Sequence, residues 1–293
     1  MKIRLAASLA CLLAALPLRP ADRPLTVAAT IFPAADIARR VAGGGVRVIL
    51  VLPPGASPHT FELTPGKVRD LQPARLIFKI GGVDDWIDGV AESLPRTLIV
   101  PLHAGIVRMA ANGHGHGDGH HHQDGSDPHY WLSAANGAAM AATIAEALAK
   151  ADPARAAGYR ANGRAVAAEF TALHAELKGM LAGLGEKRMI VLHDGWRYFA
   201  AAYGLEIAAV FQASPGREPT PRDLQELYRA ARRIHARVLF SEPQLPAASV
   251  EPVLRDLGLR LVVLDPIGGA EPGDSYAGLL RRDVRAVAAA LAR

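Results

Sequence analysis

The sequence has little cysteine, with Cys11 the only one among 293 residues. A disulfide framework within the chain is excluded, and so is a metal site built on several thiolates, so any metal ligands must be histidines or carboxylates. The sequence also lacks a His-Glu-x-x-His motif, and no general base stands in an evident position beside its histidines. The usual signs of a zinc hydrolase are therefore missing.

Basic runs and interleaved aromatic residues are missing as well. The formal net charge is +5, and aromatic residues make up only 5% of the chain. Residues 1–21 contain Lys2, Arg4 and Arg19 and no acidic residue, so removing them leaves a charge of +2. A weak and scattered positive charge gives no electrostatic footprint for nucleic acid, and we expect no such partner.

Residues 1–21 have the pattern of a secretion signal. A short basic start at residues 1–4 precedes an apolar stretch at 5–16, which is too short to span a bilayer as a stable helix. Two prolines follow at once and disfavour the alternative, a buried first helix. We expect Cys11 to leave with the signal. Lipid attachment at Cys11 is the alternative, but residues 8–11 match a lipoprotein signal poorly.

The rest of the chain alternates short apolar runs with helical patterns. In the first half the pattern predicts strands at 25–30, 46–52, 76–80 and 97–100, with helices at 33–42, 65–71 and 84–91. In the second half it predicts strands at 189–192, 207–211, 238–240 and 261–264, with helices at 195–203, 223–234, 250–257 and 276–291. Apolar strands alternating with helices indicate an α/β fold with two parallel-sheet lobes.

A long helical pattern separates the two halves. A helix at 133–150 is followed by Asp152 and Pro153, a capping residue and a proline suited to the first helical position, and the next pattern runs to about residue 184. About 30 helical residues reach roughly 45 Å, enough to span a small protein. We therefore predict a first lobe at 22–150, a rigid connecting helix at 151–185 and a second lobe at 186–293.

Residues 112–127 interrupt the first lobe with a loop rich in histidine and glycine. The loop has no apolar periodicity, and its glycine spacers leave it too flexible for a preformed site. Its imidazoles can bind metal weakly and raise the local metal concentration; a solvated tether is the alternative. The histidines of this predicted weak auxiliary site are His114, His116, His120, His121 and His122.

Four other polar residues stand just after predicted strands or just before a helix. His59 follows one strand, His129 precedes a helix, His193 ends a strand and Asp265 follows the last strand. In open α/β sheets ligands bind beyond the carboxyl ends of the strands. Three imidazoles and one carboxylate suit Zn²⁺, whereas calcium or magnesium would require several carboxylates. Spacing alone leaves packing or capping roles equally open for each histidine.

Five short motifs resemble the cluster A-I metal-binding proteins of ABC importers, and specifically the zinc branch of that family. They occur in family order over about residues 25–292: PGASPHTFELTP at 54–65, DPHYWL at 127–132, HDGWRYF at 193–199, FSEPQ at 240–244 and LDPIG at 264–268. The resemblance implies two lobes, a connecting helix and a metal site in the cleft between them. It also implies a periplasmic carrier, here expected as a monomer, that delivers Zn²⁺ to a membrane permease and is not an enzyme.

Carried over by position, the resemblance makes His59, His129 and His193 the imidazole ligands. Manganese and iron relatives commonly have Glu where this chain has His193, which favours zinc. Some zinc members have Glu just before the first histidine, where this chain has Pro58, so the fourth ligand stays open between Asp265 and water. Because ligating imidazoles usually donate their other N–H to an acceptor, Glu62 and Glu242 are candidate partners. A manganese or iron carrier of the same fold and a zinc metalloenzyme are the alternatives.

Overall fold

A computed structural model describes residues 24–111, 125–212, 220–245, 248 and 250–292. The predicted secretion signal with Cys11 lies outside these residues, and so does most of the histidine-rich loop with His114, His116, His120, His121 and His122. None of the helices in the described part of the chain combines the length and apolarity that crossing a bilayer requires.

The first lobe is built on a four-stranded parallel sheet in the order β2-β1-β3-β4. Its strands are β1 (Leu25–Ala29), β2 (Val46–Leu50), β3 (Leu76–Lys79) and β4 (Leu98–Pro101). Successive side chains of a strand point to opposite faces, so Val27 and Phe78 enter one core while Ala28 and Ile77 enter the other. The second of these cores is covered by α2 (Pro65–Leu71) and the 3₁₀ helix η1 (Asp85–Ser93).

The second lobe repeats the design with the order β6-β5-β7-β8, again all parallel. Its strands are β5 (Arg188–His193), β6 (Glu206–Gln212), β7 (Val238–Ser241) and β8 (Arg260–Val263). The helices α6 (Pro221–Arg233) and α7 (Glu251–Leu257) cover the outer face of this sheet, and α5 (Arg197–Tyr203) follows β5. The prediction of two parallel-sheet α/β lobes is confirmed.

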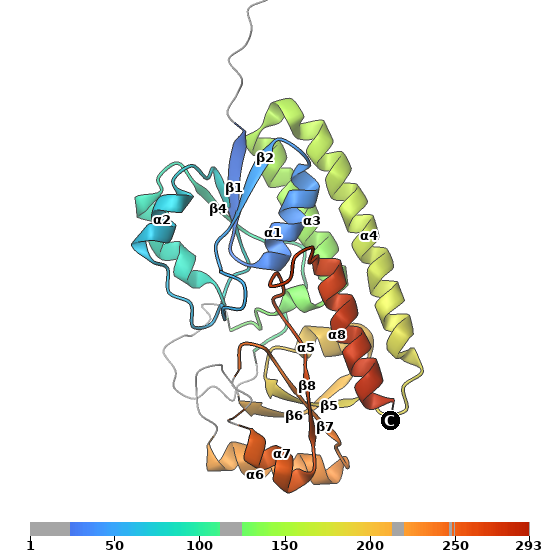
Figure 1. Cartoon of the computed structure of the whole chain (residues 1–293). Helices are drawn as coiled ribbons and strands as arrows, with labels where there is room; N and C mark the ends of the chain where they lie inside the picture. The colour runs from blue at the N-terminus through green and yellow to red at the C-terminus, as the bar shows by residue number, and fades with distance from the viewer. Residues whose placement is uncertain (1–23, 112–124, 213–219, 246–247, 249, 293) are drawn as a thin grey trace, which may run out of the picture.

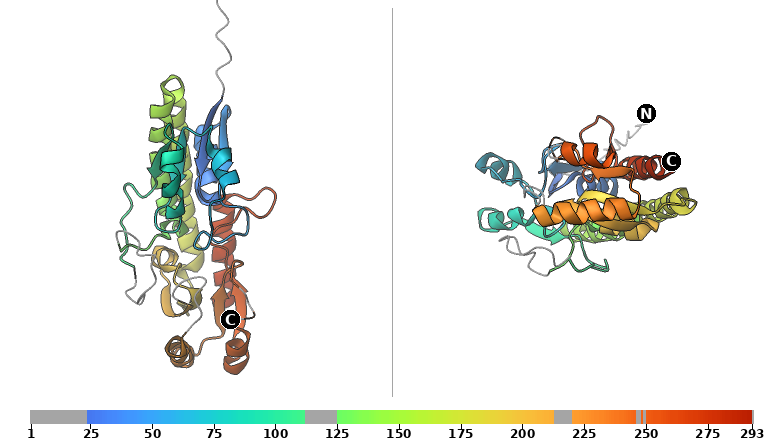
Figure 2. Two further views of the ribbon diagram at one scale, coloured as in Figure 1. Left: turned by 90° about the vertical axis from the view of Figure 1, so that its left-hand side faces the viewer. Right: turned by 90° about the horizontal axis from the view of Figure 1, so that it is seen from below.

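Among the remaining helices, α4 (Ala156–Ala182) runs along both lobes (Figure 1). The others are α1 (Phe32–Ala42) in the first lobe, α3 (Ala134–Ala151) and α8 (Tyr276–Leu291), with short 3₁₀ turns η2 (Tyr130–Leu132) and η3 (Pro153–Arg155). The 27 residues of α4 span about 40 Å. Figure 2 shows the two lobes stacked one on the other beside this helix, as predicted for the connecting element.

The helix α4 packs closely against α3. Its buried residues recur every three or four positions from Tyr159 to Leu181, which is the stripe of an amphipathic helix. Within this stripe a Cβ on Gly163 would lie 2.5 Å from the Cβ of Ala145. Gly163 lowers the intrinsic helix propensity, but it lets the two backbones approach and so stabilises the pair.

The segment between β8 and α8 returns from the second lobe to the first. The indole N–H of Trp131 donates to the Pro266 carbonyl at 2.7 Å, and the Tyr276 hydroxyl donates to the Trp131 carbonyl. A Cβ on Gly269, whose φ is +81°, would lie 2.7 Å from the Phe32 ring. The lobes therefore meet along a second line of contact besides α4, and one continuous core extends through both.

Candidate metal centre

Three histidines from three separate segments meet between the lobes. His59 follows β2, His129 stands directly before η2, and His193 is the last residue of β5. One ring nitrogen from each lies within 4.8 Å of the others, and the ring centroids are 4.9–5.1 Å apart. The Nε2 atoms of His59 and His129 are 3.1 Å apart. Tetrahedral coordination with metal–nitrogen bonds of 2.0–2.1 Å places ligand nitrogens about 3.3 Å apart, so the separation of the His59 and His129 nitrogens is close to that of two ligands sharing one ion.

The cluster is mostly shielded from solvent. His129 and His193 are only 5% and 4% exposed, whereas His59 is half-buried. The adjoining cavity measures about 10 Å³, the space of a single water-sized sphere, and is lined in part by Trp131, Leu245 and Ile267. This small cavity beside the three imidazoles is a candidate position for a single ion.

Asp127 holds the imidazole of His129. Its Oδ1 accepts hydrogen bonds from the ring Nδ1–H and from the backbone N–H of His129, both at 2.9 Å. Burial raises the pKa of Asp127, but the hydrogen bonds and charge of His129 outweigh it, and the pKa lies below its ordinary value. The carboxylate is thus ionised at neutral pH and directs the other ring nitrogen of His129, Nε2, toward the cluster.

Glu242 holds His193 in the same way. Its Oε1 accepts from the His193 Nδ1–H at 3.0 Å and from the Trp196 indole N–H at 2.9 Å, and Glu242 is only 6% exposed. Burial lowers the pKa of His193, but the charge and hydrogen bond of Glu242 raise it more, so the pKa lies above its ordinary value. The same pairing lowers the pKa of Glu242 against the effect of its burial.

A glycine lets two of the rings approach. A Cβ on Gly195 would lie 2.9 Å from Cε1 of His193 and 3.2 Å from Cδ2 of His129. No larger residue fits there unless the imidazoles move. His193 at the end of β5 is thus a candidate ligand, and Gly195, two residues later, leaves space for the imidazoles of His193 and His129.

Two residues named from the sequence lie apart from the cluster. Glu62 is exposed, and none of the hydrogen bonds among the described residues joins it to an imidazole. The acceptors observed are Asp127 for His129 and Glu242 for His193. Asp265 does not belong to the group of converging ligand atoms. Its Oδ1 accepts from the backbone N–H groups of Ile267 and Gly268 at 3.0 Å each, which closes the turn after β8.

Asp127 was given no role from the sequence, although its position two residues before His129 is a local signal. A carboxylate two residues before a histidine can reach both the backbone and the ring of that histidine, because Asp side chains bond readily to backbone two residues onward. His103, which follows β4, also lies outside the cluster of converging nitrogens.

The profile of the family described as "Zinc-uptake complex component A periplasmic" matches residues 27–290, which is nearly the whole chain. The chain belongs to this family. Its members are substrate-binding proteins of metal ABC transporters rather than enzymes.

Proteins similar to this chain are named for different metals. The high-affinity zinc uptake system protein ZnuA of Paracoccus denitrificans is 34% identical over 79% of this chain and 81% of its own length. The manganese ABC transporter substrate-binding lipoprotein scaA of Streptococcus gordonii is 28% identical over 92% of this chain and 89% of its own length. The family membership therefore leaves the identity of the metal to the ligand chemistry.

Solved structures agree with the fold. A crystal structure of ZnuA superposes with a TM-score of 0.79 at 27% identity and covers 91% of this chain and 99% of that one. A substrate-binding protein FpvC from Pseudomonas aeruginosa, in complex with Ni²⁺, superposes with a TM-score of 0.77 at 26% identity and covers 91% and 96%.

Proposed function

We propose that this chain captures Zn²⁺ in the periplasm and delivers it to the membrane permease of an ABC importer. The observation that carries the proposal is the convergence of His59, His129 and His193 on one ion-sized cavity. Zinc is the substrate of this protein and is passed on, so a carrier needs a site that is selective and can still release the ion.

The ligand chemistry supports zinc over manganese. Among the described residues the converging group contains three imidazoles and no carboxylate. Imidazole nitrogen suits zinc, whereas manganese, calcium and magnesium favour carboxylate, carbonyl and water oxygens. A manganese or iron carrier of the same fold is the competing function, and the names of some relatives favour it.

The fourth position of the metal is filled by Asp265 or by water. Oδ1 of Asp265 accepts hydrogen bonds from the backbone N–H groups of Ile267 and Gly268, so Asp265 would bind the metal through its other oxygen, Oδ2. Asp265→Asn separates the two cases. Loss of zinc affinity by tenfold or more would identify Asp265 as a ligand, because a charged ligand contributes more than about 1.4 kcal/mol. An unchanged affinity would assign the position to water.

The secreted location and the role of the histidine-rich loop complete the proposal. Residues 1–21 direct the chain across the cytoplasmic membrane, and His114, His116, His120, His121 and His122 collect metal weakly near the cleft. Relatives carry names that place them in the periplasm or on a lipid anchor, which supports this location. We expect the mature carrier to work as a monomer.

A competition experiment tests the proposed metal. The purified chain is stripped of metal and titrated with Zn²⁺ and Mn²⁺ against a chelator of known affinity. We expect one tight zinc equivalent, weaker manganese binding and a loss of several orders of magnitude in zinc affinity for His193→Ala. Tighter binding of manganese than of zinc would refute the proposal, and zinc binding by His193→Ala like the parent would refute the ligand assignment.

A further inference from the structure

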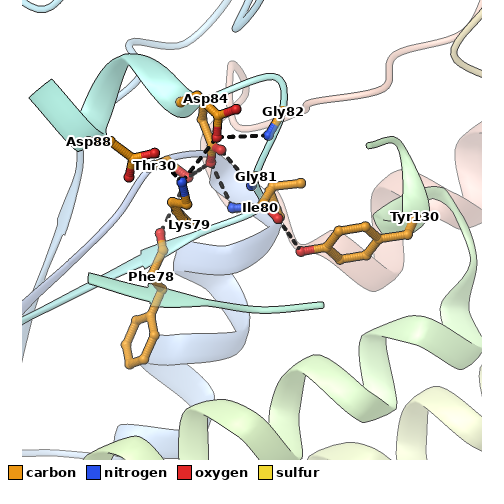
Figure 3. Close-up of polar contacts among 10 residues, drawn as sticks. Thr30, Phe78, Lys79, Ile80, Gly81, Gly82, Asp84, Asp88 and Tyr130 are labelled. Carbon is orange, nitrogen blue, oxygen red and sulfur yellow. Dashed lines mark hydrogen bonds and ion pairs between the residues drawn. The ribbon is translucent and has the colours of Figure 1, made fainter. Parts of the chain in front are cut away.

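The turn after β3 is closed by a fully buried carboxyl group. Asp84 is 0% exposed and accepts from the backbone N–H groups of Ile80 and Gly81, both at 2.7 Å, and from the hydroxyl of Thr30 at the end of β1 (Figure 3). None of the ion pairs between described residues includes Asp84. Its burial, only partly offset by these three donors, raises the pKa of Asp84 above its ordinary value.

The backbone of this turn contains two glycines with positive φ and is bonded to the elements on both sides. Gly81 and Gly82 have φ values of +91° and +87°, which lie in the left-handed region that favours glycine. The backbone N–H of Gly82 donates to Asp85 at 2.9 Å, and Lys79 pairs with Asp85 at 3.0 Å. The turn is thus tied to β1 on one side and to η1 on the other.

Residues 80–86, which comprise this turn and the start of η1, contact the two chain segments of the first lobe that carry His59 and His129. The Ile80 carbonyl accepts the hydroxyl of Tyr130 at 2.9 Å, and Tyr130 directly follows His129. The indole N–H of Trp86 donates to the Pro58 carbonyl at 3.1 Å, and Pro58 directly precedes His59. Neither bond involves an imidazole, but one holds the backbone carbonyl of the residue before His59 and the other holds the side chain of the residue after His129.

Such a connection is needed because His59 and His129 come from distant parts of the chain. They are 70 residues apart in sequence, and each lies outside the helices and strands of its lobe. A functional site must hold its groups within about 0.5 Å of the productive geometry, and elements that support the ligands provide that precision. One short segment bonded to both neighbours can set the separation of the two nitrogens.

We propose that residues 80–86, closed by Asp84, are a positioning element that sets the distance between His59 and His129 for zinc. The inference rests on the proposed function, since it requires zinc as the substrate. Through Tyr130 and Trp86 the element acts on the ligands without touching the ion.

The experiment removes each donor and keeps its ring. Trp86→Phe loses the indole N–H to Pro58, and Tyr130→Phe loses the hydroxyl to Ile80. The matched control is Tyr159→Phe, which loses a hydroxyl that donates to Asp152 at 2.8 Å near the start of α4. Three quantities are measured: zinc affinity by chelator competition, melting temperature with and without zinc, and the absorption spectrum of the Co²⁺-loaded protein.

A positioning role and a structural role give different results. If the segment positions the ligands, Trp86→Phe and Tyr130→Phe each weaken zinc binding by about three- to tenfold, the range of one lost hydrogen bond. Both also shift the cobalt spectrum and reduce the rise in melting temperature on adding zinc. Tyr159→Phe lowers the melting temperature of the empty and loaded protein alike and leaves affinity and spectrum as in the parent.

The opposite results are equally clear. Parent-like zinc affinity and cobalt spectra in both aromatic variants would overturn the inference and leave the zinc function standing. A parent chain that binds no zinc would refute the proposed function and the inference together. Asp84→Asn places an amide N–H against backbone donors and should weaken zinc binding further; if this variant does not fold, the two aromatic variants decide.

Discussion

Replacing Glu242 by glutamine tests whether the charge behind a ligand contributes to zinc binding. Both donors, from His193 and Trp196, converge on one oxygen of Glu242. A glutamine oxygen can accept the same two bonds, so the change removes the charge and keeps the shape. Hydrogen bonds to charged groups contribute about 1.5–3 kcal/mol and neutral ones about 0.5–1.5 kcal/mol. The difference between the middle values, about 1.25 kcal/mol, corresponds to a roughly eightfold weaker zinc site.

Glu242→Ala extends the test. It leaves two buried N–H groups without an acceptor and frees the imidazole of His193 to rotate, so we expect a loss of about 10- to 100-fold. The control is Glu226→Gln, which removes one charge from an exposed ion pair with Arg222 in the same lobe. This control should bind zinc like the parent.

The assay is zinc titration against a chelator at about pH 8, where an ordinary imidazole is neutral. Thermal unfolding of the metal-free proteins shows whether each variant folds. An unchanged affinity in folded Glu242→Gln would mean that the metal does not sense this charge. An unchanged affinity in Glu242→Ala as well would refute the argument that buried acceptors orient the ligands.

Four further predictions concern protons, space, the loop and the lobes. Protonated His193 beside Glu242 stabilises the folded protein, fully below the ordinary histidine pKa of about 6.5, and this stabilisation is lost as the pH rises through the raised pKa. Zinc must displace the same proton in order to bind. The rise in melting temperature on adding zinc should therefore grow from about pH 5.5 to about pH 8.5, and thermal scans that show no such growth would contradict this. Gly195→Ala should weaken zinc binding by about tenfold or more because its Cβ displaces two imidazoles, whereas Gly185→Ala, which meets no atom within 4 Å, should bind like the parent in the same titration. Deleting residues 113–125 should remove weak zinc equivalents in a calorimetric titration and keep the tight one; loss of the tight one would refute the separation. Small-angle scattering curves of the empty and loaded protein should nearly coincide, because α4 and the Trp131 contacts join the lobes. Hydrogen exchange should nevertheless rise around the ligand loops when zinc is removed. A large change in radius of gyration would disprove the rigidity of the connection.

The lobes and the long helix could be predicted because their signals are local. Apolar runs alternate with helical patterns along the chain, and a capping residue with proline stands at 152–153, before the turn that leads into α4. The strand that ends at His193 and the turn that starts after His129 lie where these patterns placed them. The predicted helix at 84–91 forms as a 3₁₀ helix, a difference of hydrogen-bond spacing that periodicity does not resolve over nine residues. The domain boundaries at 150 and 185 stay predictions.

The contacts that orient the site could not be predicted, because each depends on the packing of distant segments. No local pattern in the sequence connects Trp86 with His59, yet the indole N–H of Trp86 donates to the carbonyl of Pro58, the residue before His59. Nothing in the sequence states that Glu242, rather than Glu62, faces an imidazole 49 residues away. Asp265 stands at the expected strand end, but local backbone donors engage its carboxylate.

The unequal burial of the three histidines bears on how fast the ion leaves. Buried carboxylates hold His129 and His193, and both residues are almost inaccessible, whereas His59 as a residue is half-buried. A competing ligand from solution, or from a transporter, meets the ion from the side of His59 first. Exchange then begins with the replacement of one imidazole while two still hold the metal. For the proposed zinc carrier, the dissociation rate would follow from that first step and the equilibrium constant from all three ligands. Tight binding is then compatible with quick release to a partner that supplies the incoming ligand.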